Sequence, residues 1–290
     1  MTAPEIVVMC GDARALTPDD VAGVDVAIFD PPYSAHVHSK ATSVKTEASR
    51  FGTIDRDLGF DALDDGLLAA GAMVAAHVRR WSVIFADHED SAPAWRAACV
   101  DAGAERIRTV PWIRWSQPQL SGDRPPQGSE SILVFHAQDV GSRGGRKPRA
   151  KHWNGPGNLT HFDSRCLRGA DKQETEKPLD LMLSLVCYFT DPGETVLDLT
   201  CGYGTTAQAC RLLGRGCVAI DKRKPQADYA EARVTAPLSH RDKSRAEEWI
   251  VKTLEEASAV PLDPEHPGAY NRAQARIADA MRVAAAVEAL

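Results

Sequence analysis

A strand-like run that leads directly into a glycine-rich turn is the feature that most limits the fold of this chain. Residues 196–206 read Val-Leu-Asp-Leu-Thr-Cys-Gly-Tyr-Gly-Thr-Thr, which predicts a strand, a tight turn and the start of a helix. Gly202 and Gly204 allow the backbone to approach a ligand closely, and Asp198 stands where the strand ends. The pattern predicts a ligand at the carboxyl edge of a parallel sheet. A tight strand–helix turn without a ligand is the alternative.

A second strand-like segment, 217–220, ends at Asp221, about 20 residues after this turn. An acidic residue at that distance commonly holds the ribose hydroxyls of a nucleotide-type ligand. The turn departs from Gly-x-Gly-x-x-Gly, and no Gly-Lys-Ser/Thr phosphate loop occurs. An adenosine-type ligand is therefore favoured over a dinucleotide.

Segments typical of strands and of helices alternate along most of the chain. The pattern predicts strands at 6–9, 24–29, 81–86, 107–112, 132–136 and 195–199, and helices at 61–80, 92–102, 179–189 and 205–213. Such alternation is typical of βαβ units. We therefore expect an α/β fold with a largely parallel sheet and helices on both faces.

Composition excludes several other classes of protein. A 290-residue chain that is 43% hydrophobic and 26% charged can bury a sizeable core. No apolar run approaches the roughly 20 residues of a membrane span, and the first residues lack a secretory pattern. Seven cysteines without a Cys-x-x-Cys pair are typical of a reducing cytoplasm. Because the net charge is −6, contact with nucleic acid requires a local basic surface.

The tetrapeptide Asp30-Pro31-Pro32-Tyr33 directly follows the predicted strand at 24–29. The prolines restrict the backbone, so that the Pro31 carbonyl and the Asp30 carboxylate can accept both hydrogens of an exocyclic amine. The nitrogen lone pair is then better placed to attack an electrophile, and Tyr33 offers a ring on which a flipped base can stack. A strand-ending turn with a solvated aspartate is the alternative.

Together these segments resemble the amino-methyltransferases of DNA, which transfer a methyl group from S-adenosylmethionine to N6 of adenine or N4 of cytosine. The tetrapeptide precedes the glycine segment, which matches the circularly permuted β group, and the resemblance covers most of residues 5–235. It implies a Rossmann-like methyltransferase fold with a mostly parallel, doubly wound sheet. It implies that Asp30, Pro31, Pro32 and Tyr33 are catalytic. The implied cofactor contacts are Asp12, Lys177, Pro178, Asp198, Thr200, Gly202, Gly204, Thr205 and Asp221.

The glycine segment departs from the family pattern Asp-Pro-Phe-x-Gly-Ser-Gly. Leu199 and Thr200 replace its Pro and Phe, and Tyr203 replaces its Ser. A phenylalanine face over the cofactor is therefore missing from this segment. Asp221 stands where Glu is commoner.

The resemblance also divides the chain into four parts. Residues 1–136 form the catalytic half with a loop at 116–130, 137–171 a variable target-recognition segment, 172–236 the cofactor half, and 237–290 a helical extension. Two helices are expected there, at 242–257 and 271–290. Ile277, Met281 and Ala284 share a face of the second and are expected to dock on the core or on a second subunit.

Basic residues and aromatic residues near these boundaries suggest contacts with DNA. A stretch rich in glycine and proline carries cations suited to backbone phosphates, although a solvated charged face is the alternative: Arg143, Arg146, Lys147, Arg149 and Lys151. Trp112 and Trp115 are expected either in the target-base pocket or in the core. His36 and His38 lack partners with metal-ligand spacing, so we expect them in a loop that closes over the base.

The expected activity is site-specific methylation of N6 of a flipped adenine in double-stranded DNA. Asp at the first motif position favours adenine, because N4-cytosine enzymes often carry Ser there. N4-cytosine methylation, methylation of RNA or a protein amide, and a DNA-binding protein with a decayed site remain alternatives. No Pro-Cys pair occurs, which argues against C5-cytosine methylation through a covalent intermediate. The resemblance further suggests a bacterial or phage-encoded cytoplasmic protein of a restriction–modification system that can form a homodimer.

Overall fold

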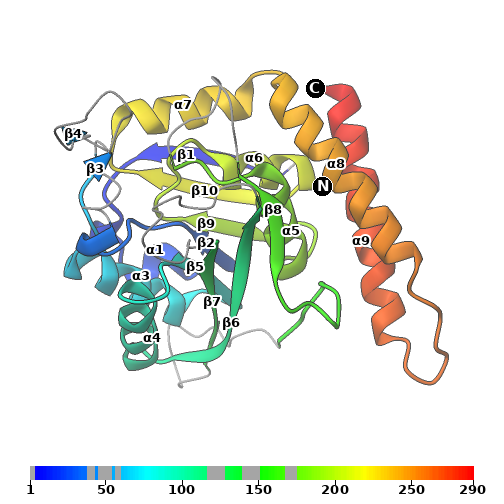
Figure 1. Cartoon of the computed structure of the whole chain (residues 1–290), viewed down its shortest axis with the longest axis horizontal. Coiled ribbons are helices and arrows are strands. Elements are labelled where there is room, and N and C mark those ends of the chain that lie inside the picture. Colours follow the sequence, from blue (N-terminus) through cyan, green and yellow to red (C-terminus); the bar gives the residue numbers. More distant parts are fainter. Residues whose placement is uncertain are drawn as a thin grey trace.

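The computed structural model describes residues 4–37, 43–44, 54–55, 60–115, 128–138, 151–166 and 175–290. In this part of the chain, one sheet of eight strands forms the centre of the molecule (Figure 1). The strands in spatial order are β1 (Ile6–Cys10), β10 (Gly216–Asp221), β9 (Thr195–Asp198), β2 (Val26–Phe29), β5 (Trp81–Ala86), β7 (Ser129–Ala137), β6 (Ala104–Trp115) and β8 (Phe162–Arg165). Of these eight, β7 alone is antiparallel to its neighbours.

Helices cover both faces of this sheet, as alternate side chains of β2 show. Val26 and Ile28 belong to the core beneath α5 (Leu179–Phe189) and α6 (Thr205–Leu213). Ala27 and Phe29 belong to the core beneath α3 (Asp65–His77) and α4 (Ser91–Asp101). All four residues of β2 are buried because both faces are covered. The expected α/β fold with a mostly parallel sheet is thus confirmed.

Strands β9 and β2 are neighbours at the middle of the sheet, and the chain leaves them in opposite directions. From β9 it passes through α6 to β10, whereas from β2 it passes through α3 to β5. The carboxyl ends of two such strands form a topological switch point, where open α/β sheets bind their ligands. Asp30 and Asp198 stand at these two ends.

Several predicted boundaries differ from the observed ones. The helix expected at 61–80 begins only at Asp65, because the carboxylate of Asp64 accepts a hydrogen bond of 2.7 Å from the Leu67 amide and caps it. Strand β7 begins at Ser129, so the last two residues of the loop expected at 116–130 are strand. Residues 116–127 of that loop lie outside the described residues.

Other elements were absent from the sequence prediction. Helix α7 (Lys224–Thr235) follows β10, and β8 joins the sheet beside β6. Further short elements include η1 (Ala13–Ala15), α1 (Pro18–Val21) and the antiparallel pair of β3 (Ser43–Val44) with β4 (Ile54–Asp55).

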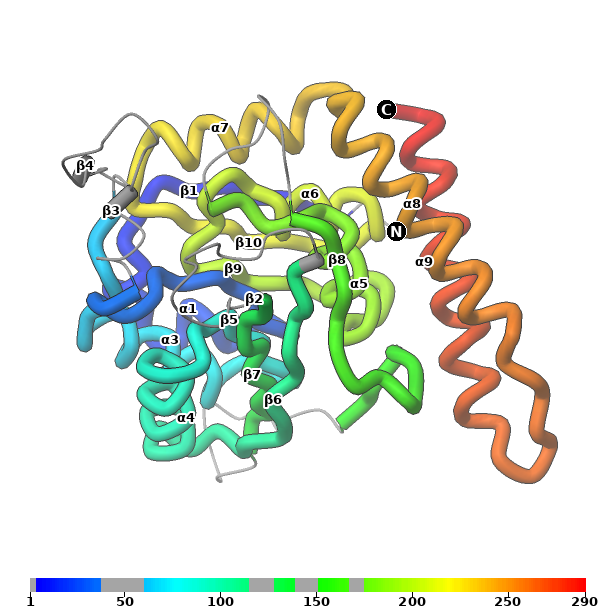
Figure 2. The backbone as a smooth tube through the Cα atoms, in the orientation of Figure 1, coloured from blue at the N-terminus to red at the C-terminus, as the bar shows by residue number. Residues whose placement is uncertain are grey.

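The helical extension consists of α8 (His240–Ser258) and α9 (Gly268–Ala289), which lie side by side at one end of the molecule (Figure 2). Both pack on the core, α8 against α5 and α9 against α6. The face of α9 that packs on the core is centred on Ala280, Val283 and Val287, which are buried, whereas Met281 of the expected face is 58% exposed. The smaller side chains of the buried face allow α9 to pack closely. Docking of the face with Met281 on a second subunit stays a prediction. In the described part of the chain, every helix is too short or too polar to cross a membrane.

Candidate active site

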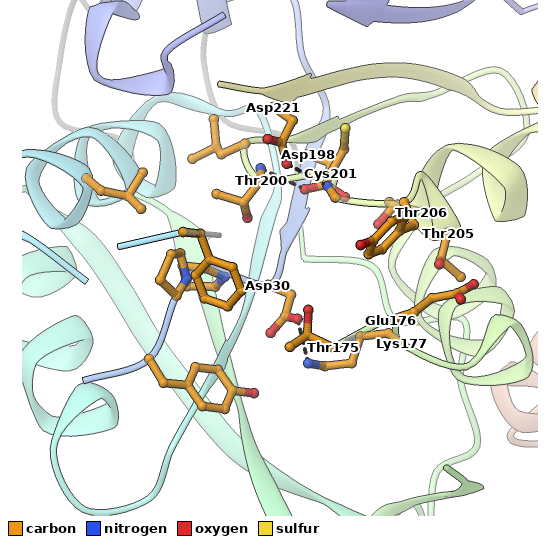
Figure 3. Close-up of a pocket in the computed structure, with 18 of the residues that line it drawn as sticks. Asp30, Thr175, Glu176, Lys177, Asp198, Thr200, Cys201, Thr205, Thr206 and Asp221 are labelled. Atoms are coloured by element: carbon orange, nitrogen blue, oxygen red, sulfur yellow. Dashed lines mark hydrogen bonds and ion pairs between the residues drawn. The ribbon is translucent and has the colours of Figure 1, made fainter. Parts of the chain in front are cut away.

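A cavity of about 460 Å³ opens at the carboxyl ends of β2, β9 and β10. Asp30, Pro31, Pro32 and Tyr33 line one side of it, and the turn that follows β9 lines the other. Figure 3 shows Asp30 and Lys177 facing the same space as Asp198, Thr200 and Asp221. Two segments that are far apart in the sequence therefore meet across one pocket.

The carboxylate of Asp30 has one paired and one unpaired oxygen. Its Oδ2 lies 2.5 Å from Nζ of Lys177. Its Oδ1 is buried and has no hydrogen-bond partner among the described residues. Burial raises the pKa of Asp30, and the neighbouring Lys177 ammonium opposes that rise.

Tyr33 is held by a second buried carboxylate, that of Glu130 at the start of β7. The Tyr33 hydroxyl donates a short hydrogen bond to Glu130, whose other oxygen lies 3.0 Å from Nη1 of Arg114. Burial favours the neutral form of Glu130, but Lys177 and Arg114 outweigh it and lower its pKa. Burial raises the pKa of Tyr33 well above 10, and Glu130 raises it further, so the hydroxyl remains a donor. The Tyr33 side chain is thereby fixed at the pocket wall.

The turn after β9 presents polar groups and an open backbone to the same pocket. Asp198 is buried, its Oδ1 accepts a hydrogen bond of 3.1 Å from the Thr200 amide, and burial raises its pKa to about 7. The Thr200 hydroxyl is buried and has no partner within the described ranges. Gly202 adopts a φ of +50°, and a Cβ on it would meet no atom closer than 4.0 Å.

Asp221 braces this turn from the end of β10. Its carboxylate accepts hydrogen bonds from the backbone amides of Gly202, at 3.0 Å, and Arg223, at 2.9 Å. The residue is only 5% exposed but lines the pocket. It therefore fixes the glycine turn in addition to facing the ligand space.

Comparison with known proteins decides the family. The model of the N6/N4 DNA methylase family matches residues 24–232, more than two thirds of the chain. The chain belongs to this family. The membership confirms the family expected from the sequence and the enzyme class, a methyltransferase that acts on amino groups of DNA with S-adenosylmethionine as its methyl donor.

Solved structures of DNA methylases share the fold at low sequence identity. The crystal structure of M1.HpyAVI in complex with SAM is 22% identical, with a TM-score of 0.56 over 80% of this chain and 100% of that one. A putative DNA modification methylase from Thermus thermophilus, complexed with S-adenosyl-L-methionine, is 21% identical, with a TM-score of 0.52 over 80% and 95%. The cytosine-N4-specific PvuII DNA methyltransferase is 10% identical, with a TM-score of 0.52 over 85% and 94%. These similarities support the Rossmann-like methyltransferase fold.

The pocket of this methylase includes most, but not all, of the residues predicted for cofactor binding. Asp12, Lys177, Pro178 and Thr205 line it together with the residues of the turn already described. The Asp12 carboxylate is paired with Arg14, which lowers its pKa. Gly204 does not line the pocket: it is the N-cap residue of α6 with a φ of +73°, and a Cβ there would lie 2.7 Å from that of Ala230 in α7. It serves helix packing.

The predicted DNA contacts are only partly described in this methylase. Arg143, Arg146, Lys147, Arg149 and His38 lie outside the described residues. Lys151 is 2.5 Å from Glu105, at the start of β6 and thus at the opposite edge of the sheet from the pocket. Trp112 is buried and also lines the pocket, whereas His36 is exposed and the Trp115 side chain lies outside the described part.

Several residues of the pocket were missed in the sequence. Glu130 fell within the expected loop, and nothing in its neighbourhood marked it as a pocket residue. Phe60 comes from a segment far from the glycine turn, and the guanidinium of Arg223 lies 5.3 Å from its ring centroid. Glu176 is held by Arg233 and by Arg241, each at 2.8 Å. Only the three-dimensional structure brings these residues together.

The residues of the pocket fit S-adenosylmethionine. The unpaired Thr200 hydroxyl and the buried Asp198 offer polar contacts at one end, and the open face of Gly202 leaves room for a ligand against the backbone. Carboxylates at strand ends suit ribose hydroxyls and an amino group. The ring of Phe60 offers an aromatic face that the glycine segment itself lacks.

Proposed function

We propose that this DNA methylase transfers the methyl group of S-adenosylmethionine to N6 of an adenine that is flipped out of duplex DNA. The observation that carries the proposal is the unpaired Oδ1 of Asp30, a buried acceptor in the pocket that the glycine turn also lines. An amino group that enters the pocket can satisfy it. An unpaired buried acceptor costs about 1–3 kcal/mol, which a donor from the substrate would offset.

Asp30 and the Pro31 carbonyl are the proposed acceptors for the two hydrogens of the target amine. Accepting these hydrogens raises the electron density on the nitrogen. When bound, S-adenosylmethionine supplies an electrophilic methyl group on its sulfonium sulfur. The raised pKa of Asp30, caused by burial, suits it to take up the proton that the methylated amine must lose.

The cofactor is proposed to lie along the turn after β9. Asp198, Thr200 and Thr205 would hold its methionine end and Asp221 its ribose, with Asp12 beside its adenine. Pro178, at the start of α5, would pack beside the methionine moiety. All of these residues line the same cavity.

Tyr33 is proposed to stack on the flipped base. Flipping costs a few kcal/mol, and stacking on an aromatic ring returns about 1–3 kcal/mol. Because Glu130 and Arg114 fix the Tyr33 hydroxyl, the ring loses little freedom when a base binds. The geometry thus supports a pocket formed before the base arrives.

Adenine is proposed over cytosine because Asp, rather than Ser, begins the motif at residue 30. The test is nucleoside mass spectrometry of duplex DNA after incubation with isotopically labelled S-adenosylmethionine. We expect labelled N6-methyladenine. Labelled N4-methylcytosine would instead show that cytosine is the substrate. The absence of both products would contradict the proposed function.

Asp30→Ala should abolish transfer and leave the affinity for the cofactor near that of the wild type, because Asp30 contacts the amine and not the methyl donor. Product formation is measured by the same mass spectrometry, and cofactor affinity by calorimetric titration. A fully active Asp30→Ala variant would remove Asp30 from the reaction.

The basic segment is proposed to contact DNA phosphates. Replacing Arg146, Lys147 and Arg149 together with Gln should weaken DNA binding and flatten its dependence on salt, since fewer counterions are released. The matched control is Lys151→Gln, because Lys151 is already paired with Glu105. Titrations of DNA at several salt concentrations give the slope of affinity against salt concentration for each variant and for the wild type. Equal slopes for the triple variant and the wild type would indicate a merely solvated surface.

The location and the assembly of the protein are also proposed. The protein is proposed to work in the cytoplasm, where its seven free cysteines suit a reducing environment. It is also proposed to form a homodimer, which sedimentation equilibrium of the full chain would test.

A further inference from the structure

The Lys177 ammonium lies in a cage of two carboxylates and three aromatic rings. Its Nζ is 2.5 Å from Oδ2 of Asp30 and 3.4 Å from Oε2 of Glu130. The ring centroids of Tyr33, Phe85 and Trp112 lie 5.5, 5.0 and 5.8 Å from the same atom. The side chain is only 12% exposed, so these contacts replace most of its hydration.

The ammonium of this side chain makes a contact that was not predicted from the sequence. The resemblance placed Lys177 beside the cofactor, and in the structure its ammonium points at the carboxylate that is proposed to bind the substrate amine (Figure 3). Its neighbour Glu176 is buried and held by Arg233 and Arg241. These ion pairs fix the backbone before α5, so the Lys177 side chain extends to Asp30 from a segment that is held in place.

The charges around Asp30 show why this contact matters. Asp30 faces Lys177, Tyr33 and Glu130, and it also interacts with Asp198 across the pocket. Without the ammonium, Asp30 would be a buried acid beside two other carboxylates, which favours its neutral form. A protonated Asp30 could no longer offer two acceptor oxygens.

We propose that Lys177 is a positioning residue of the methyl transfer: its ammonium holds Oδ2 of Asp30 and keeps the carboxylate charged, so that Oδ1 is the acceptor left for the target amine. The inference rests on the proposed function, because it assigns the unpaired Oδ1 to an amine of the substrate. Lys177 acts through Asp30 and need not touch the reacting atoms.

The experiment removes the charge while keeping the length of the side chain. In Lys177→Met, Asp30 should titrate at a higher pH, so the acid limb of the pH–rate profile moves to higher pH and much of the rate returns in alkaline buffer. At a fixed pH on the acid limb, the rate of the variant should be about tenfold below that of the wild type for each pH unit by which the limb moves. Lys177→Arg keeps the charge and should restore a profile close to that of the wild type.

Two further variants give the experiment its controls. Lys222→Met removes a lysine at the rim of the same pocket that is paired with Asp61, and it should leave the acid limb in place. Glu130→Gln removes the like charge beside Asp30 and should move the limb in the opposite direction, to lower pH.

A readout independent of activity is the titration of the Asp30 carboxyl, followed by ¹³C NMR with Asp30→Asn for assignment. We expect a higher midpoint in Lys177→Met than in the wild type. An unchanged midpoint, or a rate that falls equally at every pH, would overturn the proposal. If Lys177→Met does not fold, the ¹⁵N signal of the Lys177 ammonium in the wild-type protein must still follow the titration of Asp30, and an independent signal overturns the proposal.

These readouts separate the two proposals. If the wild type methylates neither adenine nor cytosine while Asp30 and Lys177 titrate together, the proposed function fails and the contact between the two charges stands. If methylation occurs while the two groups titrate independently, the proposed function stands and the positioning role of Lys177 fails.

Discussion

At the scale of single residues, Asp198 is a group whose charge should change close to neutral pH. It is buried where β9 ends, and burial raises its pKa to about 7, against hydrogen bonds from Thr206 and from the Thr200 amide. In the proposed cofactor site, this carboxyl group suits the cationic amino group of the methionine moiety only when it is ionised. Cofactor binding and deprotonation of Asp198 should therefore be linked.

Cofactor affinity should accordingly rise as the pH rises through about 7 and level off above it. The sign follows from the raised pKa: below it Asp198 is protonated, and binding must first remove that proton. The dissociation constant should increase by up to about tenfold for each pH unit below the midpoint. Calorimetric titrations of S-adenosylmethionine on both sides of this midpoint would measure it.

The control for this prediction is a pair of variants. Asp198→Asn should lose the pH dependence, whereas Asp61→Asn changes an exposed carboxylate on the same pocket and should keep it. An Asp198→Asn protein with the wild-type slope would assign the dependence to another group.

At the scale of elements, the two glycines of the turn before α6 serve different purposes. Both have a positive φ, +50° for Gly202 and +73° for Gly204. Gly202 faces open space at the pocket, but Gly204 touches Ala230 in α7. One glycine therefore leaves room for a ligand, and the other allows two helices to pack.

Replacing each glycine with alanine should separate these purposes. Gly204→Ala places a methyl group into a packed contact and should lower the free energy of unfolding by about 1–3 kcal/mol. Gly202→Ala bears only the strain of its φ and should lose less stability, but it should weaken cofactor binding. Urea unfolding and calorimetry measure the two effects. Equal losses of stability without a change in affinity would contradict this division.

The sequence predicted those parts of the fold that depend on local pattern. Alternating strands and helices indicated a parallel sheet, and such a sheet brings the residues after its strands to one edge. Asp30 and Asp198 could therefore be placed in one site although they are far apart in the sequence. The pattern also indicated the helices that follow Pro178 and Gly204.

The rest depends on pairings that local pattern does not encode. Glu130 reaches the pocket because β7 returns beside β5, and the short segment around it carries no mark of that return. The apolar residues of helix α7 are mostly alanines, which give no clear amphipathic stripe, and this helix was not predicted. On α9, the stripe that packs on the core lies around Ala280 and not around Met281, because the core selects the smaller side chains, which the helical period alone does not distinguish.

At the scale of the whole molecule, buried ion pairs attach the C-terminal helices to the catalytic core. Arg233 of α7 contacts Glu176 at 2.8 Å and Asp242 of α8 at 2.7 Å. It also donates a hydrogen bond of 3.0 Å to the Tyr203 carbonyl in the glycine turn. Through Asp242, the extension therefore holds Arg233, which contacts both the glycine turn and the segment that carries Lys177.

A second pair joins α9 to the core and gives the sharpest test of this attachment. Arg215 is fully buried and contacts Asp279 through both terminal nitrogens, at 3.0 and 2.6 Å, while its Nε donates to the Thr190 hydroxyl at 3.1 Å. Asp279→Ala leaves this guanidinium buried without its carboxylate. It should lower the free energy of unfolding by about 3–5 kcal/mol.

The double variant Arg215→Met, Asp279→Leu should lose clearly less than Asp279→Ala, because it removes both charges and leaves neither buried alone. Asp228→Asn breaks the exposed pair with Lys224 on α7 and should leave the unfolding midpoint unchanged. Urea unfolding of the full chain would give all three values. If Asp279→Ala unfolds at the wild-type midpoint, α9 is not held by this pair, and apolar contacts such as those of Val283 and Val287 must account for its docking.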